Sequence, residues 1–384
     1  ITGVNGCGEP FSFIMTAADI GKVQKIVDQF RHHGLDIDDG TENKKAVSKL
    51  LLNWKPEKNI VLANQVGWVD DTCKSFILTD GRIIGKKNAV YTPLMSASDR
   101  SIDTSKASIE KWKDEVASLA VGNKILIGTI SLAFVSPLLR FTNQTGFGLH
   151  IVGASSTGKT TALTAATSVW GDDGMIRTWR TTSSGLESSA AGSNENFLPL
   201  DELGEVAPKA LDEAVYMLAN GQGKQRADHR GHSVHQMRWR TVFLSTGELS
   251  VSDKLREAKI DAQKGQVVRM MDVRADGMAY GVFDTLHGYT TAADLAKQIS
   301  RSCGHASGIV GPAFVESLIA TTANRSKHFS SSLESLTKLI ANGVDISASP
   351  HSLRVAKQFA MIAMAGETAT NFGLTGWAKG AAVN

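Results

Sequence analysis

Apolar positions near the start of the chain follow first a helical period and then a strand-like one. Residues 16–30 repeat apolar side chains at helical spacing behind a capping Thr16, and 44–54 predict a second helix. Residues 59–84 contain two stretches rich in valine, isoleucine and leucine, and the Asp80-Gly81 pair is a hairpin signal. We therefore predict a small mixed α+β N-terminal domain over 1–105.

After residue 105 the hydrophobic pattern first predicts helices, then strands that alternate with helices, and finally helices again. An amphipathic helix at 108–121 and the 15-residue apolar run Ile125–Leu139 predict a helical linker or collar over 106–146. A membrane span needs about 20 apolar residues, so we expect a buried helix and no membrane association. Apolar strands alternate with helices over 147–284, which indicates an α/β core. Residues 285–384 predict a helical, lid-like C-terminal region.

Composition narrows the class of protein without naming its function. The 384 residues are 42% hydrophobic and 21% charged, which excludes a disordered or fibrous chain. A net charge of +3 gives no global argument for a nucleic-acid partner. The three cysteines are far apart and form no CxxC pair, so we expect neither a disulfide framework nor a zinc site, and a cytoplasmic location.

One motif carries a specific chemistry, because it matches the phosphate-loop pattern GxxxxGK[ST] at every position. It consists of Gly153, Ala154, Ser155, Ser156, Thr157, Gly158, Lys159 and Thr160, and Thr161 follows it. Such a loop directs backbone N–H groups at a polyphosphate. Lys159 would reach the β- and γ-phosphates, and Thr160 would hold Mg²⁺. A chance glycine-serine turn is the alternative, but the apolar strand before the motif and the helix after it favour ATP binding.

A pair of carboxylates ends the next apolar run, over 196–202. Asp201 follows Lys159 by 42 residues, and Glu202 is adjacent to it. We predict that Asp201 orders the Mg²⁺ shell and that Glu202 polarises the attacking water. Alone, these acids would be read as a helix start. Pro199 within the run is rare in a central strand and predicts a short or bulged strand there.

A later strand and three arginines complete the predicted nucleotide site. The strand over 240–248 ends in Ser245 and Thr246, either of which could contact the γ-phosphate. Arg269 follows a short apolar segment and is predicted to act on a neighbouring subunit's nucleotide, with Arg274 as the second choice. Arg354 lies on a predicted helix and could contact the nucleotide, although a solvated arginine is the more ordinary reading.

A basic segment lies between the acidic pair and this strand. Residues 221–240 contain five lysines and arginines against one acid, Asp228, which gives a local charge of +4. Gly231 suggests a turn, so we predict an exposed hairpin suited to phosphate-backbone contacts. A solvated basic loop is the alternative. The three histidines of the segment fit no strong metal-ligand pattern.

The order of these motifs resembles the helicase-like AAA+ ATPases of prophages, plasmids and integrated islands, which are often fused to a primase. The resemblance covers 60–377 and rests on sequence runs in the order expected. They are Gly153–Thr160, Leu198–Gly204, Asn220–Lys224, Leu244–Glu248, Gly265–Arg269, Arg354–Ala356 and Gly373–Trp377, preceded by Val66–Trp68. The proline of the acidic strand is shared with the family.

The resemblance implies a fold, an activity and partners. It implies an AAA+ type P-loop core and a homo-oligomeric ring, in the first place a hexamer, similar to superfamily three helicases, which hydrolyses ATP with Mg²⁺. It also implies that a hairpin grips nucleic acid, in the first place single-stranded DNA. The candidate residues on the hairpin are Lys224, Arg226, His229, Arg230 and His232. Because the chain begins at Ile1, we expect it to be a piece of a longer protein with a primase module or partner.

Two other classes of function stay open on the sequence alone. An ATP-driven oligomeric switch or protein remodeller, in defence or element maintenance, would use the same nucleotide site without gripping DNA. A small-molecule kinase with a phosphate loop is weaker, since the span after Lys159 is long and lacks an arginine-rich lid. The leading hypothesis is an ATP-dependent DNA helicase or translocase that serves replication of a mobile element.

Overall fold

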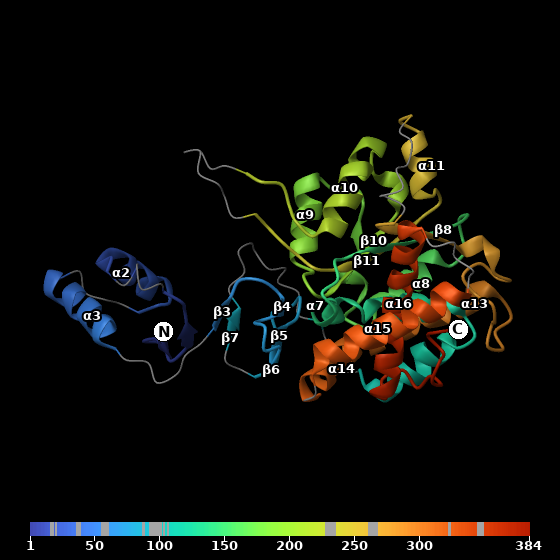
Figure 1. The fold of residues 1–384 in the computed structure, drawn as a ribbon. Coiled ribbons are helices and arrows are strands. Elements are labelled where there is room, and N and C mark those ends of the chain that lie inside the picture. Colours follow the sequence, from blue (N-terminus) through green and yellow to red (C-terminus); the bar gives the residue numbers. More distant parts are fainter. Residues whose placement is uncertain are drawn as a thin grey trace. The chain divides into compact units, whose positions relative to one another are not determined.

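The chain forms two compact units, Ile1–Ile60 and Val61–Asn384, which are described separately. The computed structural model, drawn in Figure 1, describes most of both units. The described residues are 1–15, 19, 21–35, 40–54, 61–86, 89–91, 102, 104–105, 107–226, 236–259, 268–321, 324–343 and 349–384.

The first unit is a hairpin with two helices. Its elements are β1 (Thr2–Val4), β2 (Pro10–Ser12), α2 (Val23–His32) and α3 (Thr41–Asn53). The two strands are antiparallel, and α2 buries Ile26 and Val27. Phe13 packs edge-on against Phe30 with ring centroids 5.2 Å apart. Two helices occur where the apolar spacing predicts them, and the predicted cap Thr16 lies outside the described residues.

The second unit begins with short strands that carry the predicted hairpin. They are β3 (Val61–Ala63), β4 (Gly67–Trp68), β5 (Ser75–Ile77), β6 (Ile83–Gly85) and β7 (Ala89–Tyr91). Strands β4, β5 and β6 form an antiparallel sheet, whereas β3 pairs with β7 in parallel. Gly81 has a φ of +84°, a left-handed conformation that glycine adopts freely. The hairpin signal of Asp80-Gly81 is therefore confirmed.

These strands belong to the second unit because their polar groups are bonded to the core. The backbone N–H of Trp68 donates to the Glu195 carboxylate at 2.8 Å, and its indole N–H donates to the Pro137 carbonyl at 3.0 Å. Arg140 Nε lies 2.7 Å from the same carboxylate, whose side chain is 2% exposed. The unit boundary consequently lies at residue 60, whereas the sequence pattern placed the end of the N-terminal domain at 105.

The predicted linker is a series of short helices. They are α4 (Ile109–Trp112), a π-helical turn (Lys113–Ala117), α5 (Ser118–Ala120), α6 (Lys124–Ala133), a 3₁₀ turn (Ser136–Leu138) and α7 (Leu139–Thr142). The apolar run is buried as predicted, but it is broken at Pro137, which cannot donate a helical hydrogen bond. Among the described residues no single helix is long and apolar enough to cross a membrane. Residues 124–133 and 136–142 meet that test only as a pair, bent by 50°.

A five-stranded parallel sheet forms the centre of the second unit and confirms the predicted α/β core. Its strands are β8 (Gly148–Val152), β9 (Arg177–Thr178), β10 (Phe197–Asp201), β11 (Val242–Gly247) and β12 (Met270–Arg274). Their order is β12-β8-β11-β10-β9. Pro199 pairs in register with Leu244 of β11, while β9 pairs with β10 only at Leu200 and Asp201. At Pro199, β10 thus pairs with β11 and not with β9.

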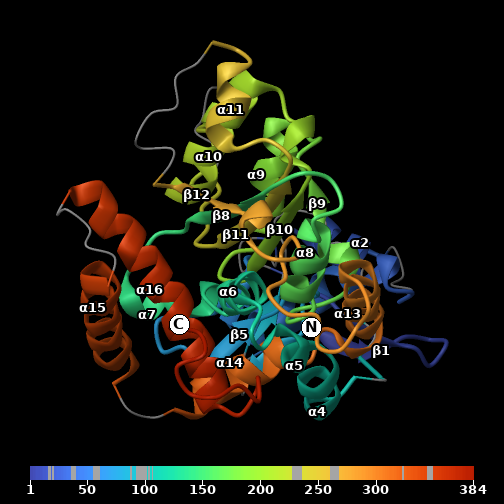
Figure 2. The same ribbon diagram turned by 90° about the vertical axis from the view of Figure 1, so that its right-hand side faces the viewer.

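Helices cover both faces of the sheet and form two separate cores (Figures 1 and 2). On one face lie α6 and α8 (Lys159–Thr167), and on the other lie α9 (Ser183–Ala191), α10 (Pro208–Asn220) and α11 (Val251–Arg256). Alternation along the strands divides their side chains between the cores. Leu244 belongs to the α8 core, whereas Phe243 belongs to the α10 core.

The chain is helical from residue 292, as its pattern predicts. The helices are α13 (Ala292–Ala306), α14 (Val310–Ala320), α15 (Arg325–Gly343) and α16 (Pro350–Asn371). Helix α16 packs against α15 and α6 and so joins this region to the sheet. Near the C-terminal end, the Trp377 indole N–H donates to the Ala117 carbonyl at 2.8 Å.

Candidate functional site

The phosphate-loop motif connects the carboxyl end of β8 to the first turn of α8. Ser156 and Gly158 have φ angles of +64° and +85°. A Cβ at Gly158 would lie 2.8 Å from Val282 Cγ2, so both backbone and space require glycine there. Lys159 is buried, and its ammonium donates to the carbonyls of Gly153 at 2.8 Å and Ala154 at 2.6 Å. The loop therefore has the wrapped shape that the motif predicts.

The turn after β12 packs directly on this loop. Val282 N–H donates to the Thr157 carbonyl at 2.8 Å. Gly281 has a φ of +73°, and a Cβ there would lie 2.3 Å from the same oxygen. Thr160 is exposed at the start of α8, whereas Thr161 is buried. The contacts of Gly281 and Val282 consequently fix one side of the loop. Its exposed side carries Thr160 and the N-terminal end of α8, where anions are favoured.

Both acidic residues lie at the carboxyl end of β10. This strand pairs with β11, which in turn pairs with β8, the strand that leads into the phosphate loop. The Thr246 hydroxyl donates to Asp201 Oδ1, and the Glu202 backbone N–H donates to the same oxygen at 3.1 Å. Glu202 has a φ of +58°, which costs free energy in a residue with a side chain. The loop itself is tied to β11, since Gly153 N–H donates to the Gly247 carbonyl at 3.3 Å. Thr246 thus links Asp201 and Glu202 to β11, the strand that pairs with β8.

Successive residues of β11 point to opposite faces, and this separates the two predicted hydroxyls. Ser245 Oγ lies 2.9 Å from His150 Nδ1 and accepts the Trp179 indole N–H at 2.9 Å. His150 Nε2 lies 3.0 Å from the Leu249 carbonyl, so that nitrogen carries the proton and Ser245 donates to Nδ1. Burial lowers the pKa of His150 to about 4. Ser245 is therefore part of a neutral buried network, and Thr246 alone reaches the acids.

The donor set fits a magnesium ion held jointly with phosphates. Within the described residues no three histidine, cysteine, aspartate or glutamate side chains form a metal cluster. Mg²⁺ needs no such cluster, because it keeps several waters and binds one or two protein oxygens plus substrate phosphates. Thr160 and Asp201 are the oxygens available for that role, and Mg²⁺ would neutralise phosphate charge there.

Two of the three predicted arginines, Arg269 and Arg354, lie away from the phosphate loop of their own chain. Arg269 precedes β12, and its carbonyl accepts from the N–H of Gly148, the first residue of β8, at 2.8 Å. The phosphate loop follows Val152, at the other end of that strand. Arg354 shares with Arg269 a pocket of about 620 Å³ at the amino ends of the strands. Arg354 therefore does not lie at the phosphate loop of its own chain.

Arg274 has a different position from Arg269. It pairs in register with Val152, at the carboxyl end of β8, but its guanidinium forms an ion pair with Asp276 at 3.1 Å. The first and second choices for the acting arginine thus lie at opposite ends of one strand.

The described arms of the basic hairpin run beside each other. Gln222 bridges to Arg238, and Gly223 N–H donates to the Met237 carbonyl at 2.9 Å. Lys224 lies 2.7 Å from Glu213, and Arg226 lies 2.6 Å from the fully buried Glu187. The predicted contacts His229, Arg230 and His232 lie outside the described residues. Two of the five candidate cations are thus already paired with carboxylates.

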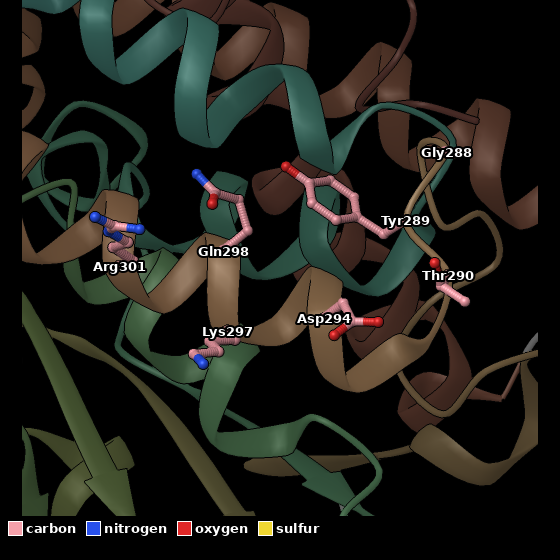
Figure 3. Close-up of a pocket in the computed structure, with 7 residues that line it drawn as sticks. All are labelled: Gly288, Tyr289, Thr290, Asp294, Lys297, Gln298 and Arg301. Atoms are coloured by element: carbon pink, nitrogen blue, oxygen red, sulfur yellow. The ribbon is translucent and has the colours of Figure 1, made fainter.

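A second hollow, of about 390 Å³, lies along α13 and contains none of the predicted site residues. Figure 3 shows that its side chains come from one helix face and from the preceding loop. They are Gly288, Tyr289, Thr290, Asp294, Lys297, Gln298 and Arg301. Asp294 also closes the capping box of α13 with Thr291, which gives it a structural role.

Several supporting residues carried no local signal in the sequence. His150 and Trp179 bond to Ser245, and Glu187 bonds to Arg226, which lies 39 positions further along the chain. Asn220 accepts from Arg269 Nε at 3.2 Å, although the two are far apart in the chain. Only the folded sheet brings these pairs together.

Comparison with known proteins identifies the family. Residues 14–239, more than half of the chain, match the model of a family described as a domain of unknown function, DUF927. The chain belongs to the DUF927 family. A comparison with curated proteins gave no sequence match. The DUF927 match confirms at the level of the family the resemblance that the motifs indicated.

One solved structure supports the fold of this DUF927 chain. It resembles a structure titled "SCCmec type IV Cch - active helicase" with a TM-score of 0.64 and 19% identity, over 96% of this chain and 65% of that one. The chain thus spans about two thirds of the length of that helicase. NtrX from Brucella abortus, solved with ADP and with ATP, matches with a TM-score of 0.27 each, at 14% and 15% identity. The ADP complex match covers 53% of this chain and 49% of that one, and the ATP complex match 57% and 53%.

Proposed function

We propose that this DUF927 chain is an ATP hydrolase that drives a DNA helicase or translocase. One observation carries the proposal: the phosphate loop, the Asp201–Glu202 pair and Thr246 meet at the carboxyl ends of three adjacent strands. In this arrangement Lys159 binds the β- and γ-phosphates, and Thr160 and Asp201 hold Mg²⁺. Glu202 polarises the attacking water, and Thr246 reports the state of the γ-phosphate.

The position of the arginines favours an AAA+ type ring over a monomer. Arg269 and Arg354 lie at the amino ends of the strands, whereas the phosphate loop lies at the carboxyl ends. A guanidinium at that end cannot reach the nucleotide of its own chain, but it can reach that of a neighbour. Stabilisation of phosphoryl-transfer charge by an arginine supplied in trans is a known device. We accordingly infer a homo-oligomer, in the first place a hexameric ring.

The nucleic-acid part of the proposal rests on the fold and on the hairpin. The similar structure is titled an active helicase, and the basic segment returns to the core directly before β11. Phosphate contacts from Lys224, Arg226, His229, Arg230 and His232 would suit single-stranded DNA of any sequence. Replication of a mobile element, with a primase module or partner, is the setting we infer from the family resemblance.

The test is ATP hydrolysis together with strand displacement on a forked duplex. Lys159→Ala and Glu202→Gln should each abolish both activities, while Glu205→Gln should keep them. Glu205 is a matched control because it is an exposed acid of the same turn that bonds to Thr178 instead of facing the loop. A wild-type chain that hydrolyses ATP but neither binds nor unwinds DNA would contradict the helicase part.

A second function, a nucleotide-driven switch or protein remodeller, is favoured by one observation. Lys224 and Arg226 are paired with Glu213 and Glu187, so their charge is partly compensated within the chain. Arg230→Gln distinguishes the two functions without disturbing these pairs. Loss of DNA-stimulated ATP hydrolysis supports the helicase, whereas an ATPase rate that never responds to DNA supports the switch.

A further inference from the structure

The pocket shared by Arg269 and Arg354 has the chemistry of an anion site. Three cationic side chains line it, and none of its described lining residues carries a carboxylate. The first half of α16 supplies one wall, and the residues just before β8 and β12 and the end of α10 supply the others. The polar lining residues are Asn143, Gln144, Thr145, Asn220, Arg269, Arg354, Lys357 and Gln358. Its volume of about 620 Å³ is in the range of small-ligand sites.

Arg269 connects this pocket to the helix that carries the basic hairpin. Its guanidinium lies 4.5 Å from the centroid of the Tyr216 ring, and Nε donates to Asn220 Oδ1 at 3.2 Å. Tyr216 and Asn220 are one turn apart on α10, and Asn220 is the last residue of that helix. Arg269 therefore grips the final turn of α10.

The hairpin begins at once after that turn. Gly221 has a φ of +72°, and its carbonyl accepts from Trp239 N–H at 2.8 Å. A Cβ at Gly221 would lie 2.2 Å from the Trp239 carbonyl oxygen, so the two arms are in close contact at their base. A movement of the last turn of α10 would consequently move both arms.

We propose that this pocket binds a phosphate group, and that the phosphate takes Arg269 from Asn220 and so changes the position of the hairpin. An ionised oxygen is a stronger acceptor for a guanidinium than a neutral amide oxygen is. Lys357 and Arg354 supply the remaining charge. The effect on the hairpin deepens the proposed helicase function and rests on it, whereas phosphate binding does not.

The Gln358 side chain gives the pocket a hydrogen-bond acceptor that no described residue uses. Its Nε2 donates to the Val268 carbonyl at 2.8 Å, while its buried Oε1 has no hydrogen-bond partner among the described residues. A buried acceptor without a partner costs free energy. A protonated phosphate oxygen or a ribose hydroxyl on the ligand would supply the missing donor.

The binding test uses inorganic pyrophosphate and calorimetry on the full chain carrying Lys159→Ala, which weakens the phosphate loop as a competing site. Adding Arg354→Gln or Lys357→Gln should weaken binding about tenfold, the loss of one charge-assisted contact. Arg301→Gln, an exposed helical arginine outside the pocket, should leave affinity unchanged. Equal affinities in all of these variants would overturn the proposal.

Asn220 provides a test of the exchange itself, because two substitutions should act in opposite directions. Asn220→Ala removes the competing acceptor and should tighten pyrophosphate binding, whereas Asn220→Asp pairs with Arg269 and should weaken it. Protease cleavage within 227–235, followed with and without pyrophosphate, reads the hairpin in the same variants. If both substitutions change the pyrophosphate affinity in the same direction, the exchange is contradicted. A protease cleavage rate that does not change with pyrophosphate would also contradict it.

The phosphate could come from a neighbour's nucleotide or from a nucleic-acid backbone, and mixing distinguishes them. If the source is a neighbour's nucleotide, Arg354→Gln chains mixed with Lys159→Ala chains should recover ATP hydrolysis. If it is the backbone, mixing recovers nothing and Arg354→Gln weakens binding of an abasic oligonucleotide. A chain that binds pyrophosphate here yet never hydrolyses ATP would contradict the proposed function and leave the pocket intact.

Discussion

The two ends of the central sheet carry different kinds of chemical groups. At the carboxyl ends, loop backbone and short polar side chains converge within one chain: the phosphate loop, Asp201, Glu202 and Thr246. At the amino ends, long cations meet in an open pocket next to the hairpin base. In our proposals, the first end binds and hydrolyses ATP, and the second responds to a bound phosphate. We infer that chemistry and response are separated along the strands.

The largest expected effect of a single substitution lies at the carboxyl ends. Glu202→Gln should lower the ATP hydrolysis rate by about 10²- to 10⁴-fold, the contribution typical of a general base. Affinity for a non-hydrolysable ATP analogue should change little, because Glu202 binds water rather than phosphate in our proposal. Steady-state hydrolysis and equilibrium binding measure the two quantities. A variant that hydrolyses ATP at the wild-type rate would exclude Glu202 as the base.

The next effect is on stability and depends on pH. The folded state holds His150 neutral with a pKa of about 4, against about 6.5 in an unfolded chain. Between these values the unfolded state binds more protons, so the free energy of unfolding falls as pH drops from about 6.5 towards 4. The total loss is about 3 kcal/mol.

Denaturant unfolding of wild type and His150→Gln at several pH values checks this prediction. Glutamine keeps a donor for the Leu249 carbonyl, and every other titrating group is common to both proteins. The difference between the two stabilities should therefore shrink at low pH. A difference that stays constant from pH 7 to pH 4 would show that His150 is not buried neutral.

A smaller effect is expected where the hairpin arm meets α9. Arg226→Ala leaves the buried Glu187 carboxylate unpaired and should lower the free energy of unfolding measurably. Glu187→Gln should cost less, because an exposed arginine is easily solvated. Chemical denaturation gives both values, with Lys224→Ala as the control, since its pair with Glu213 is exposed. Equal costs for all three would mean that the Glu187 pair does not anchor the arm.

The smallest effect distinguishes the two neighbouring hydroxyls of β11. Thr246→Val should reduce hydrolysis about tenfold with little change in folding, if it removes one hydrogen bond in the site. Ser245→Ala should instead lower stability by about 1 kcal/mol and leave the rate nearly unchanged. Parallel hydrolysis and unfolding measurements decide the matter. The reverse result would place Ser245, not Thr246, beside the phosphate.

The carboxyl-end site was predictable because its signals are local. Gly153–Thr160 is one continuous motif, and Asp201 and Glu202 end a recognisable strand. The choice between Ser245 and Thr246 depends on which face of β11 turns toward the acids, and only strand pairing fixes that. The Arg269–Asn220 and Arg226–Glu187 contacts join segments distant in sequence, so no periodicity reports them. The N-terminal boundary differed for the same reason, since Trp68 and Glu195 meet only after folding.

The outer side of β10 has a consequence for the homo-oligomer that we propose. Strand β9 is only two residues long, and Pro199 offers no N–H group just before the pairing begins. A two-residue edge strand that follows a proline on its neighbour is a poor template for a strand from another chain. Open-ended strand-to-strand growth, the route to fibrous aggregates, is thereby discouraged at this margin. In the ring that we propose, a contact at this margin would use side-chain surfaces, which can specify a closed set of subunits.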